Sequence, residues 1–200
     1  MKKGSARPYH HGNLRAEVLR QAEAALDTVG YQNLSLRELS RALGVSHAAP
    51  RRHFADKEAL LDALACNGYE RLHDKMAAVV KDQKQPFETA LLKLGRAYVG
   101  FATSHVALMD LMLTRKHDEQ ASAELRQKAA AVYGLPIEWV ARAQAAGLVV
   151  PGDPMRLALA AIAAVQGLIV ISNKGKIAGI PVEVLVEEVL ERIIFGLRPR

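Results

Sequence analysis

The fold is decided by residues 35–60, which read SLRELSRALGVSHAAPRRHFADKEAL. Ser35 and, three residues later, Glu38 have the spacing of a capping box, which predicts the start of a helix. Apolar residues then repeat at helical spacing up to Gly44, and glycine is common just beyond a helix end (Leu36, Leu39 and Leu43). We therefore expect a short helix that ends in a turn built on residues 43–45.

Two further helices are expected after this turn. Ser46 is a suitable N-cap for a short helix reaching about Phe54, and Asp56 is a suitable N-cap for a longer one. A helix, a tight turn with glycine and a second short helix fit a helix-turn-helix, whose second helix reads the major groove. The side chains expected on its exposed face are small or cationic (His47, Ala48, Arg51, Arg52 and His53). An ordinary helical hairpin within a core fits the same pattern.

Helical patterns fill the rest of the chain. Residues 14–29 form one amphipathic pattern that ends at Gly30, and prolines stand near the starts of several later ones. The later helices are expected at about 86–105, 106–115, 122–147, 154–173 and 181–196. No alternating strand pattern of useful length occurs. We expect an all-α fold of about nine helices, with one domain over 1–60, including a flexible basic arm at 1–10, and a second over 61–200.

The charge distribution points to an anionic partner for the first domain. The chain of 200 residues carries a net charge of +6. Residues 1–60 hold ten Lys and Arg against six Asp and Glu, whereas residues 61–197 are balanced. A basic segment attached to a neutral body favours nucleic acid as the partner, although a basic surface that is merely solvated would look the same.

Several other classes of protein are disfavoured. Cys66 is the single cysteine, so no internal disulfide is possible, and no spacing of Cys and His resembles a metal site. The apolar run at 157–171 reaches roughly 22 Å as a helix, which is short of the ~30 Å hydrocarbon layer. No secretory signal, nucleophile elbow, phosphate loop or zinc-protease motif occurs. We expect a cytoplasmic protein without cofactor or metal and without enzymatic activity.

Three stretches together resemble the TetR family of bacterial transcriptional repressors. They are residues 9–14 (YHHGNL), 35–40 (SLRELS) and 44–60 (GVSHAAPRRHFADKEAL), which cover about a third of the chain. In the body, residues 98–102 (YVGFA) and 105–109 (HVALM) resemble the subgroup whose C-terminal domain is named for a Trp-His-Gly motif. That tripeptide reads Val165-Gln166-Gly167 here.

The resemblance implies particular DNA contacts. Family members contact phosphates through a Tyr in the second helix of the motif, the His two residues later and a Lys that opens the next helix. The His and the Lys match His53 and Lys57, whereas Arg51 replaces the Tyr. Arg37 matches a position that contacts the DNA backbone. The remaining candidates lie along the recognition helix, with His47 and Ala49 where base-reading residues usually sit (Ser46, His47, Ala48, Ala49 and Arg52).

The resemblance also implies two roles for the body. The last two apolar helices are expected to pair with their symmetry mates in a homodimer, which matches a palindromic operator. The helices between about 86 and 147 are expected to enclose a cavity for a small hydrophobic effector. The candidate lining residues are Tyr98, Phe101, His105, Met109, Met112, Tyr133, Trp139 and Gln166.

The sequence thus favours a repressor that a small molecule releases from double-stranded DNA. The alternatives are a protein that binds any duplex equally and, less favoured, an all-helical enzyme. A specificity ratio at a stated salt concentration would separate the first alternative from a repressor.

Overall fold

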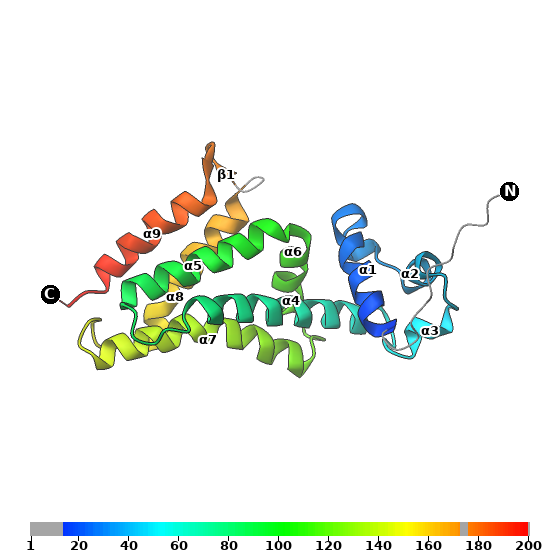
Figure 1. Ribbon diagram of the computed structural model, residues 1–200, viewed down its shortest axis with the longest axis horizontal. Coiled ribbons are helices and arrows are strands. Elements are labelled where there is room, and N and C mark those ends of the chain that lie inside the picture. Colours follow the sequence, from blue (N-terminus) through cyan, green and yellow to red (C-terminus); the bar gives the residue numbers. More distant parts are fainter. Residues whose placement is uncertain (1–13, 173–175, 200) are drawn as a thin grey trace. The chain divides into compact units, whose positions relative to one another are not determined.

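The computed structural model describes residues 14–172 and 176–199, and these residues form nine α-helices (Figure 1). The expected all-α fold is confirmed. The boundary between two compact units falls between Leu64 and Ala65, within helix α4 (Lys57–Val79). The sequence placed the domain boundary at residues 60 and 61, and the basic arm at 1–10 lies outside the described residues.

The first unit is a cluster of three helices and the start of α4. It contains α1 (Leu14–Val29), α2 (Leu36–Leu43) and α3 (Ala48–Arg51), and a 3-10 turn (Tyr31–Asn33) joins α1 to α2. Each pair among α1, α2 and α3 is in contact. Their apolar residues meet in one small core (Val18, Ala22, Leu26, Leu34, Leu39, Phe54 and Leu60). Burial of this apolar area from three short helices is what makes the unit stable.

The turn between α2 and α3 is fixed by Gly44. Its φ is 66°, in the left-handed region that favours glycine. The Gly44 N–H donates to the Arg41 carbonyl at 3.2 Å, and the Val45 N–H donates to the Ser40 carbonyl at 3.0 Å. This pair of bonds is the Schellman motif, which satisfies the carbonyls at the end of α2 and reverses the chain into α3.

Two details of the capping prediction are wrong. The helix begins where Ser35 and Glu38 indicated, but the Ser35 side chain makes no capping hydrogen bond. The short helix α3 spans only Ala48–Arg51, and its N-cap is His47 rather than Ser46. A backbone turn leads into α3, in which the Ala49 N–H donates to the Ser46 carbonyl. This backbone hydrogen bond takes the place of the expected bond to the Ser46 side chain. The Asp56 cap is confirmed, because its Oδ1 accepts from the Ala59 N–H at 2.8 Å.

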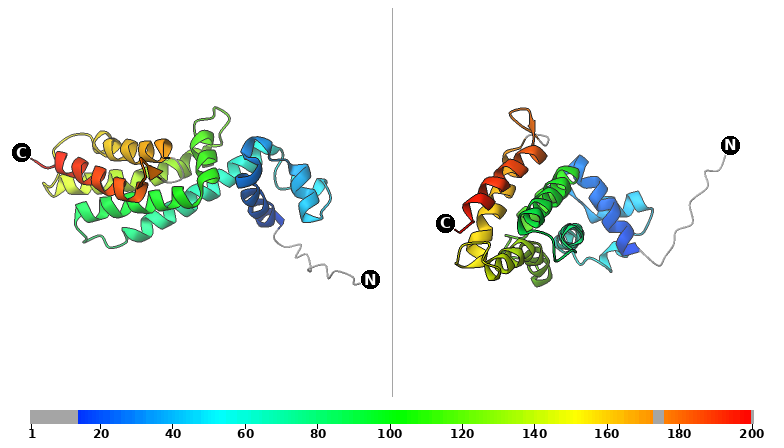
Figure 2. Two further views of the ribbon diagram at one scale, coloured as in Figure 1. Left: turned by 90° about the horizontal axis from the view of Figure 1, so that it is seen from above. Right: turned by 60° about the vertical axis from the view of Figure 1, so that its left-hand side comes forward.

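The second unit is a bundle of long helices. After the rest of α4 come α5 (Phe87–Ser104), α6 (Val106–Arg115), α7 (Ala123–Ala145), α8 (Pro154–Ile171) and α9 (Val182–Gly196). Helix α5 packs against α7, α8 and α9, and α8 packs between α7 and α9 (Figures 1 and 2). The α5–α9 pair approaches closely at Gly95, where an added Cβ would lie 2.3 Å from Leu190 Cδ1. The side chain of Arg96 reaches across this pair and donates to both carboxylate oxygens of Glu187, at 2.6 and 2.7 Å.

A small hairpin before α9 was not predicted. Strands β1 (Lys176–Ile177) and β2 (Ile180–Pro181) pair antiparallel, with Ile177 opposite Ile180. Ala178 and Gly179 form the turn, and both have positive φ, 48° and 83°. Two-residue strands are too short to produce an alternating pattern, so periodicity did not indicate them.

Helix α8 is apolar on almost every side. Its inward residues Ala158, Ala161 and Val165 are buried, while Leu159 and Val170 are 52% and 72% exposed. Among the described residues it is the one helix whose length and composition would allow it to cross a membrane. However, α8 packs against α7 and α9 and contains the polar residue Gln166, as expected of a helix in a bundle. Exposed apolar patches on soluble proteins mark contact sites.

The Gly44 turn provides a stability test. Replacing Gly44 with Ala should lower the free energy of unfolding by roughly 1–2 kcal/mol, because an L side chain is strained at this φ. Gly134 is the matched control, because it lies within α7 and no atom lies within 4 Å of an added Cβ. Replacing Gly134 with Ala should raise the free energy of unfolding by up to about 1 kcal/mol. Urea unfolding of both variants measures the difference. Equal effects of the same sign would contradict this account of the turn.

Candidate DNA-binding face and effector cavity

The residues predicted to contact DNA share the surface around α3. Arg37 on α2 is exposed. Six residues between the turn before α3 and the loop after it are exposed as well (Ser46, His47, Ala48, Arg51, Arg52 and His53). Ala49 is half-buried and Pro50 is buried against the unit's core. The surface combines three arginines and two histidines with small residues, which allows close approach to a polyanion.

Lys57 lies at the start of α4, and part of its hydrogen-bonding capacity is already in use. Its ammonium donates to the Gln32 carbonyl of the 3-10 turn, and the residue is half-buried. This bond ties α4 to the turn between α1 and α2. An ammonium group has three N–H donors, so two of them remain for a phosphate at the N-terminus of α4.

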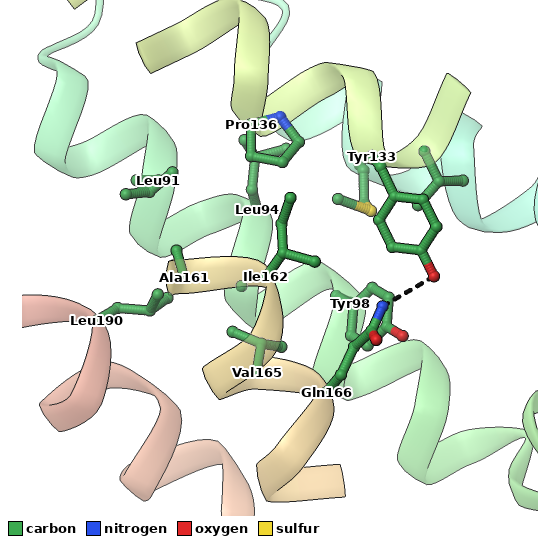
Figure 3. A pocket seen from close by; sticks show the side chains of 13 residues that line it. Leu91, Leu94, Tyr98, Tyr133, Pro136, Ala161, Ile162, Val165, Gln166 and Leu190 are labelled. Carbon is green, nitrogen blue, oxygen red and sulfur yellow. Dashed lines mark hydrogen bonds between the residues drawn. The ribbon is translucent and has the colours of Figure 1, made fainter. Parts of the chain in front are cut away.

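The second unit contains a narrow apolar cavity between its long helices (Figure 3). About 40 Å³ of it admits water-sized molecules. The lining comes from α4, α5, α7, α8 and α9. The lining residues are Met76, Leu91, Leu94, Gly95, Tyr98, Val132, Tyr133, Pro136, Ala161, Ile162, Val165, Gln166 and Leu190.

Polar groups gather at one end of this cavity. Figure 3 shows Tyr98, Tyr133 and Gln166 together there, whereas Leu91 and Leu190 lie at the other end. The Tyr133 hydroxyl oxygen accepts from Gln166 Nε2 at 2.8 Å and from Lys116 Nζ at 2.5 Å. Burial is the main cause that raises the pKa of the Tyr98 phenol above its ordinary value, and the neighbouring Tyr133 raises this pKa further. The nearby Gln166 lowers the pKa again, but only in part. The Tyr98 phenol is therefore neutral near pH 7, and Lys116 supplies the nearby cation.

Three of the eight residues predicted to bind the effector line this cavity: Tyr98, Tyr133 and Gln166. Phe101 and His105 do not. Phe101 is buried, and the His105 ring stacks on it with the ring centres 4.5 Å apart. His105 Nδ1 also lies 3.1 Å from the Phe101 carbonyl, so this pair stabilises the corner between α5 and α6.

Met109, Met112 and Trp139 also lie outside the cavity lining. All three are buried. Met112 packs against α4 at Gly68, where an added Cβ would lie 2.5 Å from the Met112 sulfur. Trp139 lies under the guanidinium of Arg142, whose carbon is 4.7 Å from the ring centre. These side chains fill the core of the second unit.

The sequence did not single out the aliphatic lining residues. Leucines, valines and alanines that line a cavity have the same helical spacing as those that fill a core, so periodicity does not separate them. Two weaker signals were available. Pro136 stands inside α7 and leaves the Val132 carbonyl without its usual donor, and Gly95 stands in the middle of α5. Both residues line the cavity.

An exposed apolar surface follows the last two long helices. The side chains of α8 and α9 that form this surface are exposed or half-buried, whereas Ile194 is buried in the core. They are Leu159, Ile162, Ala163, Gln166, Ile169 and Val170 on α8, and Val184, Leu185, Val189 and Ile193 on α9. Ala158 and Ala161 on α8 are buried within this chain.

A helix-turn-helix unit followed by a helical body with a cavity defines a class of one-component DNA-binding regulators. Residues 18–64 match the family described as bacterial regulatory proteins of the tetR family. Residues 91–197 match the tetracyclin repressor-like C-terminal domain. The chain belongs to the TetR family of transcriptional regulators. The Trp-His-Gly subgroup remains a prediction.

Individual relatives agree with this assignment. The chain is 39% identical to a protein of unknown function from Rhodococcus sp. RHA1, with a TM-score of 0.88 over 97% of this chain and all of that one. The TetR family regulator PfmR from Thermus thermophilus has the same fold, with a TM-score of 0.72 at 17% identity over 91% of this chain and 99% of that one. The HTH-type transcriptional regulator YobS of Bacillus subtilis (strain 168), itself uncharacterized, is 29% identical over 60% of this chain and 62% of its own length.

Family membership gives the general function. TetR-family proteins are DNA-binding transcription factors that act as dimers and respond to small molecules, so membership points away from an enzyme.

Proposed function

We propose that this protein is a cytoplasmic repressor that binds a palindromic operator as a homodimer and leaves it when a small apolar effector enters the second unit. The observation that carries the proposal is the exposed cationic surface around α3, held in place by the Gly44 turn and the Asp56 cap. Arg37, Arg51, Arg52 and His53 are assigned to phosphates, with Lys57 at the start of α4. His47, with the small residues beside it, is assigned to base edges (Ser46, Ala48 and Ala49).

The palindrome follows from the proposed dimer. A two-fold dimer presents two copies of α3 related by symmetry, and such a dimer fits two half-sites about one helical turn apart. The exposed apolar surface on α8 and α9 supports this interface, since contiguous apolar patches on soluble proteins mark contact sites.

The effector is assigned to the cavity between α4, α5, α7, α8 and α9. Its lining is apolar with a few polar groups, which is the usual character of small-molecule sites. The cavity has only about 40 Å³ of space for water-sized molecules, so a larger effector must displace side chains or helices to enter. That displacement is the proposed origin of release from DNA, because a ligand shifts an equilibrium only through its different affinities for two states.

The position of Arg51 provides the test of DNA recognition. An operator is first selected from random duplexes with the purified protein, and binding is then titrated at several salt concentrations. Arg51→Ala should weaken binding to the operator and to a scrambled duplex alike, and should lower the magnitude of the salt slope by about one unit per monomer. His47→Ala, the matched variant, should relax sequence preference and leave the salt slope nearly unchanged.

Three outcomes would count against this assignment. If Arg51→Ala costs about 1–3 kcal/mol per half-site only on operators with one particular base, Arg51 reads that base instead. If neither variant changes affinity, α3 does not enter the groove. If the unmodified protein binds every duplex equally, it is a non-specific DNA-binding protein.

The dimer has its own test. Val170→Glu on α8 should place a carboxylate in the interface, at a cost of at least several kcal/mol when buried without a partner, and should yield monomers in sedimentation velocity. Val106→Glu on α6 is the matched control, because Val106 is 65% exposed and Val170 is 72% exposed. The control should remain dimeric. A dimeric Val170→Glu variant would contradict the interface.

A further inference from the structure

The cavity has one unsatisfied polar group, the hydroxyl of Tyr98. Tyr98 is only 5% exposed, and among the described residues its Oη is the buried side-chain polar atom that makes no hydrogen bond of acceptable geometry, although Gln166 and Tyr133 lie close enough to shift its pKa. Leaving a buried hydroxyl unpaired destabilises a fold, so such groups are normally matched to a partner. Tyr98 lines the cavity, and Figure 3 shows it at the same end as Tyr133 and Gln166.

The surrounding groups offer more donors than acceptors. The Tyr133 oxygen already accepts two hydrogen bonds, from Gln166 and Lys116, so its own O–H can only donate, either to the neighbouring Tyr69 and Tyr98 oxygens or to a ligand. The Lys116 ammonium has further N–H groups, and no carboxylate lies within ion-pair distance of it in the described part of the chain. The side-chain amide oxygen of Gln166 is the acceptor among these groups.

The rest of the cavity excludes polar ligands. Every other lining residue is aliphatic, methionine, glycine or proline, drawn from five helices. A ligand therefore meets hydrogen-bonding side chains at one end only. Its remaining surface must be apolar, because a polar group placed elsewhere would lose water without gaining a partner.

From this imbalance we propose that the effector is a compact apolar molecule whose one polar group is a hydrogen-bond acceptor, a carbonyl or carboxylate oxygen, held by the Tyr98 hydroxyl. The inference rests on the proposed function for the identity of the cavity as the effector site. The Tyr133 hydroxyl is the second donor to the same oxygen. Lys116, one hydrogen bond away through Tyr133, favours a carboxylate over a neutral carbonyl.

The test uses four probes of one shape: cyclohexanone, cyclohexanecarboxylate, cyclohexylammonium and cyclohexane. Dissociation constants are measured by NMR titration of the full-length protein without DNA. Cyclohexanone and cyclohexanecarboxylate should bind about tenfold more tightly than the other two, since cyclohexylammonium only donates and cyclohexane makes no hydrogen bond. The ratio between the two acceptors distinguishes a carboxylate effector from a neutral carbonyl one.

Tyr98→Phe is the decisive variant. It should weaken both acceptor probes about five- to tenfold, the value of one hydrogen bond, and leave cyclohexane unchanged. Tyr31→Phe is the matched control for affinity, because Tyr31 lies in the 3-10 turn of the first unit and does not line the cavity. Tyr69, which is buried beside Tyr133, donates its hydroxyl hydrogen to the Met112 carbonyl at 3.0 Å and serves as the control for stability. Without ligand, Tyr98→Phe should raise the Tm by a few degrees and Tyr69→Phe should lower it.

The outcomes separate the two proposals. Acceptor probes that bind no better than cyclohexylammonium, or a Tyr98→Phe variant with unchanged affinities, would overturn the inference about the effector. If the acceptor probes bind as expected but never weaken operator binding, the inference stands and the role of this cavity in release from DNA is wrong.

Discussion

The second unit depends on a helix without a polar face. Helix α8 buries Ala161 and Val165 toward its own bundle and exposes Leu159 and Val170 on the opposite side. A helix that is apolar all round is stable in water only when both sides are covered. Its own chain covers one side and lines the cavity, and in our proposal a second copy covers the other. The effector and the dimer partner therefore contact the same helix.

This arrangement offers a physical route for signalling within the second unit. Ala161, Ile162, Val165 and Gln166 line a cavity with only about 40 Å³ of space for water-sized molecules, so a larger effector must displace side chains or helices, and in our proposal it moves α8. Movement of α8 would alter its contacts with the partner, and close-packed helices change position in discrete steps. Gln166 lines the cavity and is half-buried, and in our proposal it also contacts the partner.

Local features of the sequence predicted the order and the ends of the helices well. Gly44, Asp56, Pro86 and Pro154 act on the backbone nearest to them, so their effects are readable from neighbouring residues. Pro136 is the exception, because it lies inside α7 and marks neither of its ends. The Ser46 cap failed because a backbone turn replaced the side-chain bond. The hairpin at 176–181 was missed because two-residue strands have no periodicity.

The cavity was harder to predict than the helices. Residue type alone favours aromatic residues and methionines as lining residues, but Met112 packs against Gly68 in the core. Which helix faces pack and which leave a gap depends on complementary side chains far apart in the sequence. The Tyr98 hydroxyl is an example: its helix and its burial were predictable, but its lack of a partner required the positions of α7 and α8.

The central claim is that the cavity and the DNA-binding surface are coupled. The most direct measurement compares the dissociation constant of the tightest acceptor probe for the free dimer and for the dimer saturated with operator. By linkage, operator DNA must weaken binding of the probe by the same factor by which the probe weakens binding of the operator. A typical coupling factor is at least about fivefold. Equal affinities of the probe for the free and the operator-bound dimer would contradict the account.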